Sequence, residues 1–171
     1  MNGSSDDAAE ASRDDAEGTS PNNAIEASGS GGASGDGPFF APRGPRPVGP
    51  YPHARRFGNL LFLSGIGPRH ARTDAIGEGI EAQTRDCIEN IKAILEDAGS
   101  SLDRVIDVTV FLTDLPRDFA AYNRVYGDYF GAIRPTRTTV GVVSLPTAIS
   151  IEMKVIAEAP AVSRSETPSS P

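Results

Sequence analysis

The sequence contains few of the residues that form disulfides, metal sites or membrane segments. Its 171 residues include a single cysteine, Cys87, two histidines and no tryptophan. One cysteine excludes an internal disulfide, and so few histidines and cysteines offer no cluster with metal-ligand spacing. No run of 18 apolar residues is present, and the N-terminus is acidic without an apolar stretch. We therefore expect no metal, no membrane span and no secretory signal, and a reducing, cytoplasmic setting fits.

The acidic charge of the chain is confined to its first 38 residues. This segment holds eight Asp or Glu residues and one arginine, so it carries the whole formal net charge of -7. It is rich in alanine, serine and glycine and has too little apolar surface to offset its ordering entropy. We predict a disordered acidic tail over 1–38, one domain over 39–160, and a second disordered tail over 161–171.

Between the tails, the apolar periodicity predicts two helices and five strands. Two short strands are expected in 54–65, a loop in 66–79, helices in 80–99 and 118–131, a strand in 105–114 and a closing hairpin of two strands in 134–160. This β-β-α-β-α-β-β order predicts an α+β two-layer sandwich with both helices on one face of a sheet. Apolar residues are also expected on the other face: Phe111, Val143 and Ile156. An apolar face without a covering layer predicts an oligomer.

Two charged residues stand out in the predicted closing hairpin. Arg137 begins a strand of threonine, valine and glycine, and Glu152 lies between Ile151 and Met153 on the return strand. On spacing alone, an edge-strand arginine and an outward-facing glutamate are the simpler interpretations. The functional alternatives are a guanidinium that grips a substrate carboxylate and a carboxylate that orients water or transfers a proton.

Four other residues were weighed in the same way. Tyr51 either packs at a strand start or lines a polar pocket, and Asn123 either faces solvent or donates a hydrogen bond to a substrate or loop. Cys87 falls on the apolar helix stripe and is better explained as a buried side chain than as a nucleophile. His53 is expected at the surface. Basic residues do not alternate with aromatic ones along a stripe, so nucleic-acid binding has little support.

Six segments resemble the Rid family, the reactive intermediate deaminases, also known as YjgF or RidA-like proteins. The resemblance spans about residues 46–158 and includes the pattern P-x-R-[ST]-x-V…LP…[IV]-E-[IM]. The segments are GPY (49–51), NLLFLSGIGP (59–68), IEAQTRDCIENIKAILEDAGSSLDRVIDVTVFLTDL (80–115), DFAAYNRVYGDYF (118–130), RPTRTTVGVVSLP (134–146) and ISIEMKVIA (149–157).

This resemblance implies a fold, an assembly and an activity. The fold is chorismate-mutase-like, and the assembly is a homotrimer with sites in the clefts between subunits. The activity is hydrolysis of 2-imino or 2-enamino acids to 2-keto acids and ammonia, without metal or organic cofactor. Arg137 matches the family arginine that binds the substrate carboxylate, and Glu152 matches the glutamate that positions water. Tyr51, Ser64 and Asn123 match positions that line the cleft.

Departures from the family pattern leave two alternatives open. Thr139 replaces a frequent cysteine, which argues against an essential thiol there. The segment PHAR (52–55) is similar to the 2-aminomuconate deaminase branch, and the loop cations Arg69, His70 and Arg72 could face a dicarboxylate. The other alternative is a non-catalytic trimer that binds small carboxylates, since a fold does not fix a function.

Overall fold

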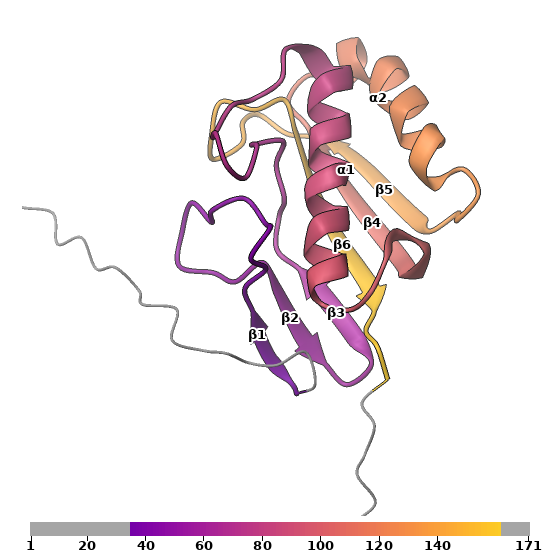
Figure 1. The fold of residues 1–171 in the computed structure, drawn as a ribbon. Coiled ribbons are helices and arrows are strands. Elements are labelled where there is room, and N and C mark those ends of the chain that lie inside the picture. The colour runs from indigo at the N-terminus through magenta and orange to yellow at the C-terminus, as the bar shows by residue number, and fades with distance from the viewer. Residues whose placement is uncertain (1–34, 162–171) are drawn as a thin grey trace, which may run out of the picture.

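The computed structural model describes residues 35–161, which form one six-stranded sheet covered on one face by two helices (Figure 1). The sheet order is β1-β2-β3-β6-β4-β5. The elements are β1 (Gly37–Phe39), β2 (Ala54–Phe57), β3 (Leu60–Leu63), α1 (Gly79–Asp97), a 3-10 turn (Leu102–Arg104), β4 (Val105–Leu112), α2 (Leu115–Phe130), β5 (Thr136–Gly141) and β6 (Ile151–Glu158). The predicted α+β sandwich is confirmed. The predicted tail segments 1–34 and 162–171 lie outside the described residues.

Each helix follows from its apolar stripe and its end signals. The predicted stripe of α1 is buried at Cys87, Ile88, Ile91 and Leu95, and the helix is followed by Gly99 at a positive φ of 76°. Helix α2 begins three residues earlier than expected, because Asp114 caps it by accepting a hydrogen bond from the Arg117 backbone N–H (3.1 Å).

The core lies between the helices and the helix-facing side of the sheet. Side chains of α1 and α2 pack there against the central strands β4 and β6, which pair antiparallel. Fully buried members from the strands are Val108, Val110, Leu112, Ile151, Met153 and Val155. This alternation leaves the intervening residues of both strands on the opposite, outer face.

The predicted hairpin over 134–160 is wrong. Strand β5 pairs with β4 in parallel, and β6 pairs with β4 on its other side, so β5 and β6 do not touch as a ladder. The segment 142–150 crosses over β4 instead of making a tight turn. Alternation identifies a strand, but it carries no information about which strand is its neighbour.

Smaller differences concern the edges of the sheet. Strand β1 was not expected, and it begins inside the predicted tail because it pairs with β2. In a regular strand Ile106 would share the face of Val108, but a register irregularity between Val105 and Asp107 turns Ile106 outward. Val143 lies beyond the end of β5 and is fully exposed, so it is not part of the outer face.

The outer face carries apolar side chains that no other layer of residues 35–161 covers. Phe62 lies opposite Ile156, and Phe111 lies opposite Glu152 and Val140 in the registers of the neighbouring strands. Phe57 and Phe62 are exposed, while Phe111 and Ile156 are half-buried. The prediction of an uncovered apolar face is confirmed for these residues. Within the described part of the chain, no helix has the length and apolar character to cross a membrane.

Replacement of two glycines by alanine is expected to have opposite effects on the free energy of unfolding. Gly99→Ala should lower the free energy of unfolding by about 1–2 kcal/mol, because Gly99 has a left-handed backbone and its added Cβ would crowd Pro160. Gly127→Ala should raise it by about 0.5–1 kcal/mol, because Gly127 lies in α2 with open space around its Cα. Urea unfolding measures both, and equal effects of the two substitutions would contradict this account of the fold.

Candidate active site

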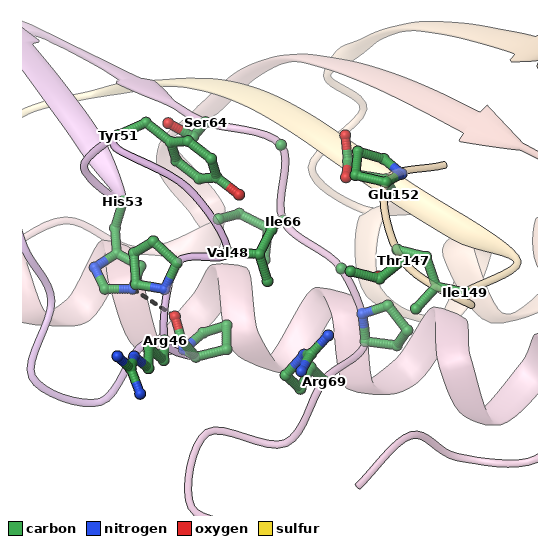
Figure 2. A pocket seen from close by; sticks show the side chains of 16 residues that line it. Arg46, Val48, Tyr51, His53, Ser64, Ile66, Arg69, Thr147, Ile149 and Glu152 are labelled. Carbon is green, nitrogen blue, oxygen red and sulfur yellow. Dashed lines mark hydrogen bonds between the residues drawn. The ribbon is translucent and has the colours of Figure 1, made fainter. Parts of the chain in front are cut away.

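A pocket with a mainly apolar surface and a few polar side chains lies where three segments meet beside α1 and the start of β6 (Figure 2). One wall comes from the proline-rich segment before β2, the second from the loop after β3, and the third from the segment that leads into β6. Its lining residues are Pro45, Arg46, Pro47, Val48, Tyr51, His53, Ser64, Gly65, Ile66, Gly67, Pro68, Arg69, Pro146, Thr147, Ile149 and Glu152. The predicted site residues Tyr51, Ser64 and Glu152 therefore share one pocket.

Glu152 is the only acidic side chain among these lining residues. It projects from β6, and it is half-buried, which raises the pKa of its carboxyl above the ordinary value. The loop residue Gly65 lies directly against it: a Cβ at this position would come within 2.6 Å of the Glu152 carboxyl carbon. Glycine at position 65 thus lets the backbone approach the carboxylate and narrows the pocket around it.

The neighbouring polar groups are held by backbone contacts. The Ser64 hydroxyl donates to the carbonyl of Pro52 (2.7 Å), and the Ser64 N–H donates to the carbonyl of His53 (2.9 Å). The Tyr51 ring lies beside Ser64 with its hydroxyl directed into the pocket (Figure 2). Tyr51 is therefore the better placed of the two to offer its hydroxyl to a ligand.

The expectation of a surface position for His53 is wrong. His53 is 6% exposed, its Nδ1 accepts from the Ala41 N–H (2.9 Å), and its Nε2 lies 2.7 Å from the Pro45 carbonyl. These partners require a proton on Nε2, so the ring is the neutral Nε2–H tautomer. With both nitrogens engaged, His53 fixes the proline-rich wall and has no nitrogen left for acid–base chemistry.

Helix α1 fixes the wall formed by residues 66–69. The Cys87 thiol donates to the Ile66 carbonyl (2.9 Å), and the Asn90 amide donates to the carbonyls of Gly67 (3.0 Å) and Arg69 (2.8 Å). Cys87 is fully buried, and this burial raises the pKa of its thiol, so it is a packing residue as expected.

Arg137 lies outside this pocket and packs on α2. Its guanidinium donates to the Asn123 side-chain oxygen (2.8 Å) and lies over the ring of Tyr126, 4.6 Å from the centroid, and near that of Tyr122 at 5.7 Å. The Tyr122 hydroxyl in turn shares a hydrogen bond with Thr139 (3.1 Å). No ion pair with an acid is found for Arg137 among residues 35–161. The side chain is thus oriented by an amide and aromatic faces, and its charge remains available.

Arg137 and Glu152 point to opposite faces of the sheet in one chain. Arg137 is in register with the buried Val108, so it faces the helix side, whereas Glu152 is in register with Phe111 on the outer face. The structure therefore brings together Tyr51, Ser64 and Glu152, and separately Arg137 and Asn123. It does not bring the two groups together within one chain.

The sequence did not single out one arginine of the pocket lining, and it suggested two other cations that do not line the pocket. Arg46 lines the pocket, and its position between two prolines, which is visible in the sequence, was the only signal. Of the three loop residues expected to face a dicarboxylate, Arg69 lines the pocket, while His70 and Arg72 do not. His70 is exposed and bonded through Nδ1 to the Thr73 hydroxyl (3.0 Å). Residues 35–161 contain no group of three His, Cys, Asp or Glu residues that could hold a metal ion.

Comparison with known proteins places this chain and its fold in one family. The chain belongs to the family described as Endoribonuclease L-PSP, whose profile matches residues 42–159. A RutC family protein of Pyrococcus abyssi is 49% identical over 120 residues, which cover 70% of this chain and 94% of that protein. TdcF of Escherichia coli, which is named as a reactive intermediate deaminase, is 40% identical over 118 residues, 67% of this chain and 91% of its own length. The resemblance to the Rid family is confirmed.

Solved structures agree with the fold. TdcF of Escherichia coli with bound serine has a TM-score of 0.68 at 36% sequence identity, covering 72% of this chain and 98% of that one. The YjgF protein of Escherichia coli has a TM-score of 0.67 at 33% identity, covering 71% and 97%. These relatives do not single out the 2-aminomuconate branch.

Glu152→Gln is expected to stabilise the protein at neutral pH. Burial raises the folded-state pKa of Glu152, so its ionised form is disfavoured by folding, and this cost grows as the pH rises through that pKa. The melting temperature of the variant should exceed that of the wild type at pH 7.5, and the difference should vanish near pH 4. Glu158→Gln, on the same strand but exposed, is the control without such a gain. A less stable Glu152→Gln at pH 7.5 would mean that a cation offsets the buried charge.

Removal of the hydroxyl from each of the two tyrosines next to Arg137 should change the free energy of unfolding in opposite directions. The Tyr126 hydroxyl is buried without a hydrogen-bond partner among the described residues, so Tyr126→Phe should raise the free energy of unfolding by roughly 1 kcal/mol. Tyr122→Phe should lower it by about 0.5–1.5 kcal/mol, because its bond to Thr139 is lost. Denaturant titration of both variants checks the pair, and a destabilised Tyr126→Phe would refute the assignment.

Proposed function

We propose that the protein hydrolyses 2-imino or 2-enamino carboxylates to 2-keto acids and ammonia. The observation that carries this proposal is a half-buried glutamate, Glu152, in a pocket whose lining contains no other acid. The same chain holds an oriented arginine, Arg137, without an acidic partner among residues 35–161. Relatives support it: TdcF is named as a reactive intermediate deaminase, and its solved structure holds serine, a small amino acid.

The chemistry requires little beyond orientation and proton transfer. The Arg137 guanidinium forms two parallel hydrogen bonds to the substrate carboxylate and so fixes the C=N carbon in one place. Glu152 accepts a proton from water as the water oxygen bonds to that carbon, and it passes this proton to the nitrogen, which gives an amino alcohol. The hydroxyl of the amino alcohol then gives its proton to the nitrogen through Glu152, the C–N bond breaks, ammonia leaves, and the carbonyl of the 2-keto acid remains. Burial raises the pKa of Glu152, so its carboxylate is a stronger proton acceptor than that of an ordinary glutamate.

The reaction needs more than one copy of the chain. Because Arg137 and Glu152 face opposite sides of the sheet, a small substrate cannot contact both within one chain. We propose a homotrimer in which Arg137 and Asn123 of one copy complete the Tyr51, Ser64 and Glu152 pocket of the next. The uncovered outer face, with Phe57, Phe62 and Ile156, supports such an assembly.

Two other functions fit less well. A trimer that only binds carboxylates would use Arg137 but would not need a half-buried Glu152, and unchanged ligand affinity with lost turnover in Glu152→Gln separates the two. The family description names an endoribonuclease, yet the histidine of the pocket, His53, has both ring nitrogens bonded to backbone. For the narrower 2-aminomuconate assignment, ammonia release from that compound is the test.

Mixing two inactive variants tests the shared site. Arg137→Ala and Glu152→Gln should each lose at least about thirtyfold in kcat/KM, since each removes a charged contact to substrate or water. Each shared site takes Arg137 from one copy and Glu152 from the next. When the two variants are co-refolded in equal amounts, each of these residues is intact with a chance of about one half, so about a quarter of the sites should contain both intact residues. The assay follows imine loss by semicarbazone formation after an amino acid oxidase acts on alanine.

The matched control mixes two lesions of the same pocket. Gly65→Ala displaces the Glu152 carboxyl, so its mixture with Glu152→Gln should remain inactive in every junction. Recovery of about a quarter of wild-type activity in the first mixture alone is the expected result. No recovery in the mixture of Arg137→Ala with Glu152→Gln would place both residues in one chain's site and contradict the assembly. A wild type that does not accelerate loss of the imine would contradict the deaminase proposal itself.

A further inference from the structure

Two arginines line the Glu152 pocket on the side away from the glutamate. Figure 2 shows Arg46 and Arg69 on the side of the pocket opposite Glu152 and Ser64. The guanidinium of the exposed Arg46 is directed away from the other labelled side chains, so Arg69 is the cation that is placed to meet a ligand. Arg46 belongs to the proline-rich wall, and Arg69 to the loop after β3. Since His53 is the neutral tautomer and Glu152 is the only acid in the lining, positive charge exceeds negative charge in this pocket.

The backbone under both arginines is fixed independently of their side chains. The Asn90 amide donates to the carbonyl of Arg69 itself and to that of Gly67, and Pro68 restricts the chain between them. Arg46 lies between Pro45 and Pro47, and the carbonyl of Pro45 accepts a hydrogen bond from His53. Such preorganised positions reduce the entropy lost when a ligand binds.

Neither arginine is neutralised in the way that the structural arginines are. Arg43 donates to Asp97 at 2.6 Å, and Arg117 donates to Asp118 at 2.7 Å. By contrast, the ion pair of Arg69 with Asp74 is 4.0 Å long, and Asp74 is 67% exposed on the same loop while Arg69 is 29% exposed. Arg46 has no ion pair with an acid in residues 35–161. A long pair with an exposed acid contributes little and leaves Arg69 able to bind an anion.

We propose that Arg69 is a second anion subsite that binds a carboxylate on the side chain of the substrate. This inference rests on the proposed function and narrows it: the substrates are imino or enamino acids with a second, distal carboxylate. Arg137 holds the carboxylate next to the reacting carbon, and Arg69 holds the distal one. A substrate with an apolar side chain would remove water from the Arg69 guanidinium without supplying a counterion, which is unfavourable. Water adds and ammonia leaves as before, and the distal carboxylate is unchanged.

The test compares two stable product analogues of equal length, 2-oxoglutarate and 2-oxopentanoate. They differ in one end group, a carboxylate in the first and a methyl in the second. Calorimetric titration of the wild type should show at least about tenfold tighter binding of 2-oxoglutarate, the size expected of a charge-assisted contact in a partly buried site. Arg69→Gln should abolish most of this preference, and Arg69→Lys, which keeps the charge without the planar fork, should retain part of it.

The matched control is Arg72→Gln in the same loop. Arg72 is exposed and does not line the pocket, so its removal takes away the same charge without touching the subsite, and the wild-type preference should persist. Melting curves confirm that Arg69→Gln is folded. Equal affinity of the wild type for the two acids, or an unchanged preference in Arg69→Gln, would overturn the subsite. Turnover of the alanine-derived imine is measured separately, so failure of the subsite is distinguished from failure of the deaminase proposal.

Discussion

The antiparallel pairing of β6 with β4 is the constraint on which the site depends. It buries Met153 and Val155 against the helices and, by the two-residue period of a strand, turns Glu152 to the outer face opposite Phe111. The parallel pairing of β5 on the other edge of β4 places Arg137 beside the buried Val108 and over α2. A carboxylate and a cation suited to the same small molecule are thereby separated by the sheet itself. The proposed assembly of copies follows from this separation, and it would use the apolar outer face that residues 35–161 leave uncovered.

The pocket around Glu152 is built to stay in place. Its walls are tied by His53 to the proline-rich segment and by Cys87 and Asn90 to α1, with hydrogen bonds of 2.7–3.0 Å. Rigid walls allow Gly65 to press its backbone against the Glu152 carboxyl, and the resulting burial raises the pKa of that group. The same burial that makes Glu152 a stronger proton acceptor therefore makes its charge unfavourable for folding. The proposed function and stability oppose each other at this residue, which is common at sites that use a perturbed carboxyl group.

Apolar periodicity predicted much of this fold but not its pairing. Periodicity predicted both helices and every strand except β1, because burial of one face dictates these patterns. The apolar stripe of α1 and the alternation of β6 are the clearest examples. The hairpin prediction failed because alternation does not specify a partner strand. His53 was misplaced because backbone groups distant in sequence, at Ala41 and Pro45, hold it. Tyr51 and Glu152 were candidates from the residue pattern, Ser64 was added by the family resemblance, and the three share a pocket. The position of Arg46 in the pocket lining depends on tertiary packing that no local pattern reports.

A crystal structure of the assembled protein with a bound 2-keto acid tests the central claim most directly. The account predicts that the ligand carboxylate forms paired hydrogen bonds with the Arg137 guanidinium of one copy, while its carbonyl carbon faces the Glu152 carboxyl of the neighbouring copy. A ligand held wholly within one chain, with its carboxylate next to the carbonyl on Arg46 or Arg69 and Arg137 turned to solvent, would contradict it.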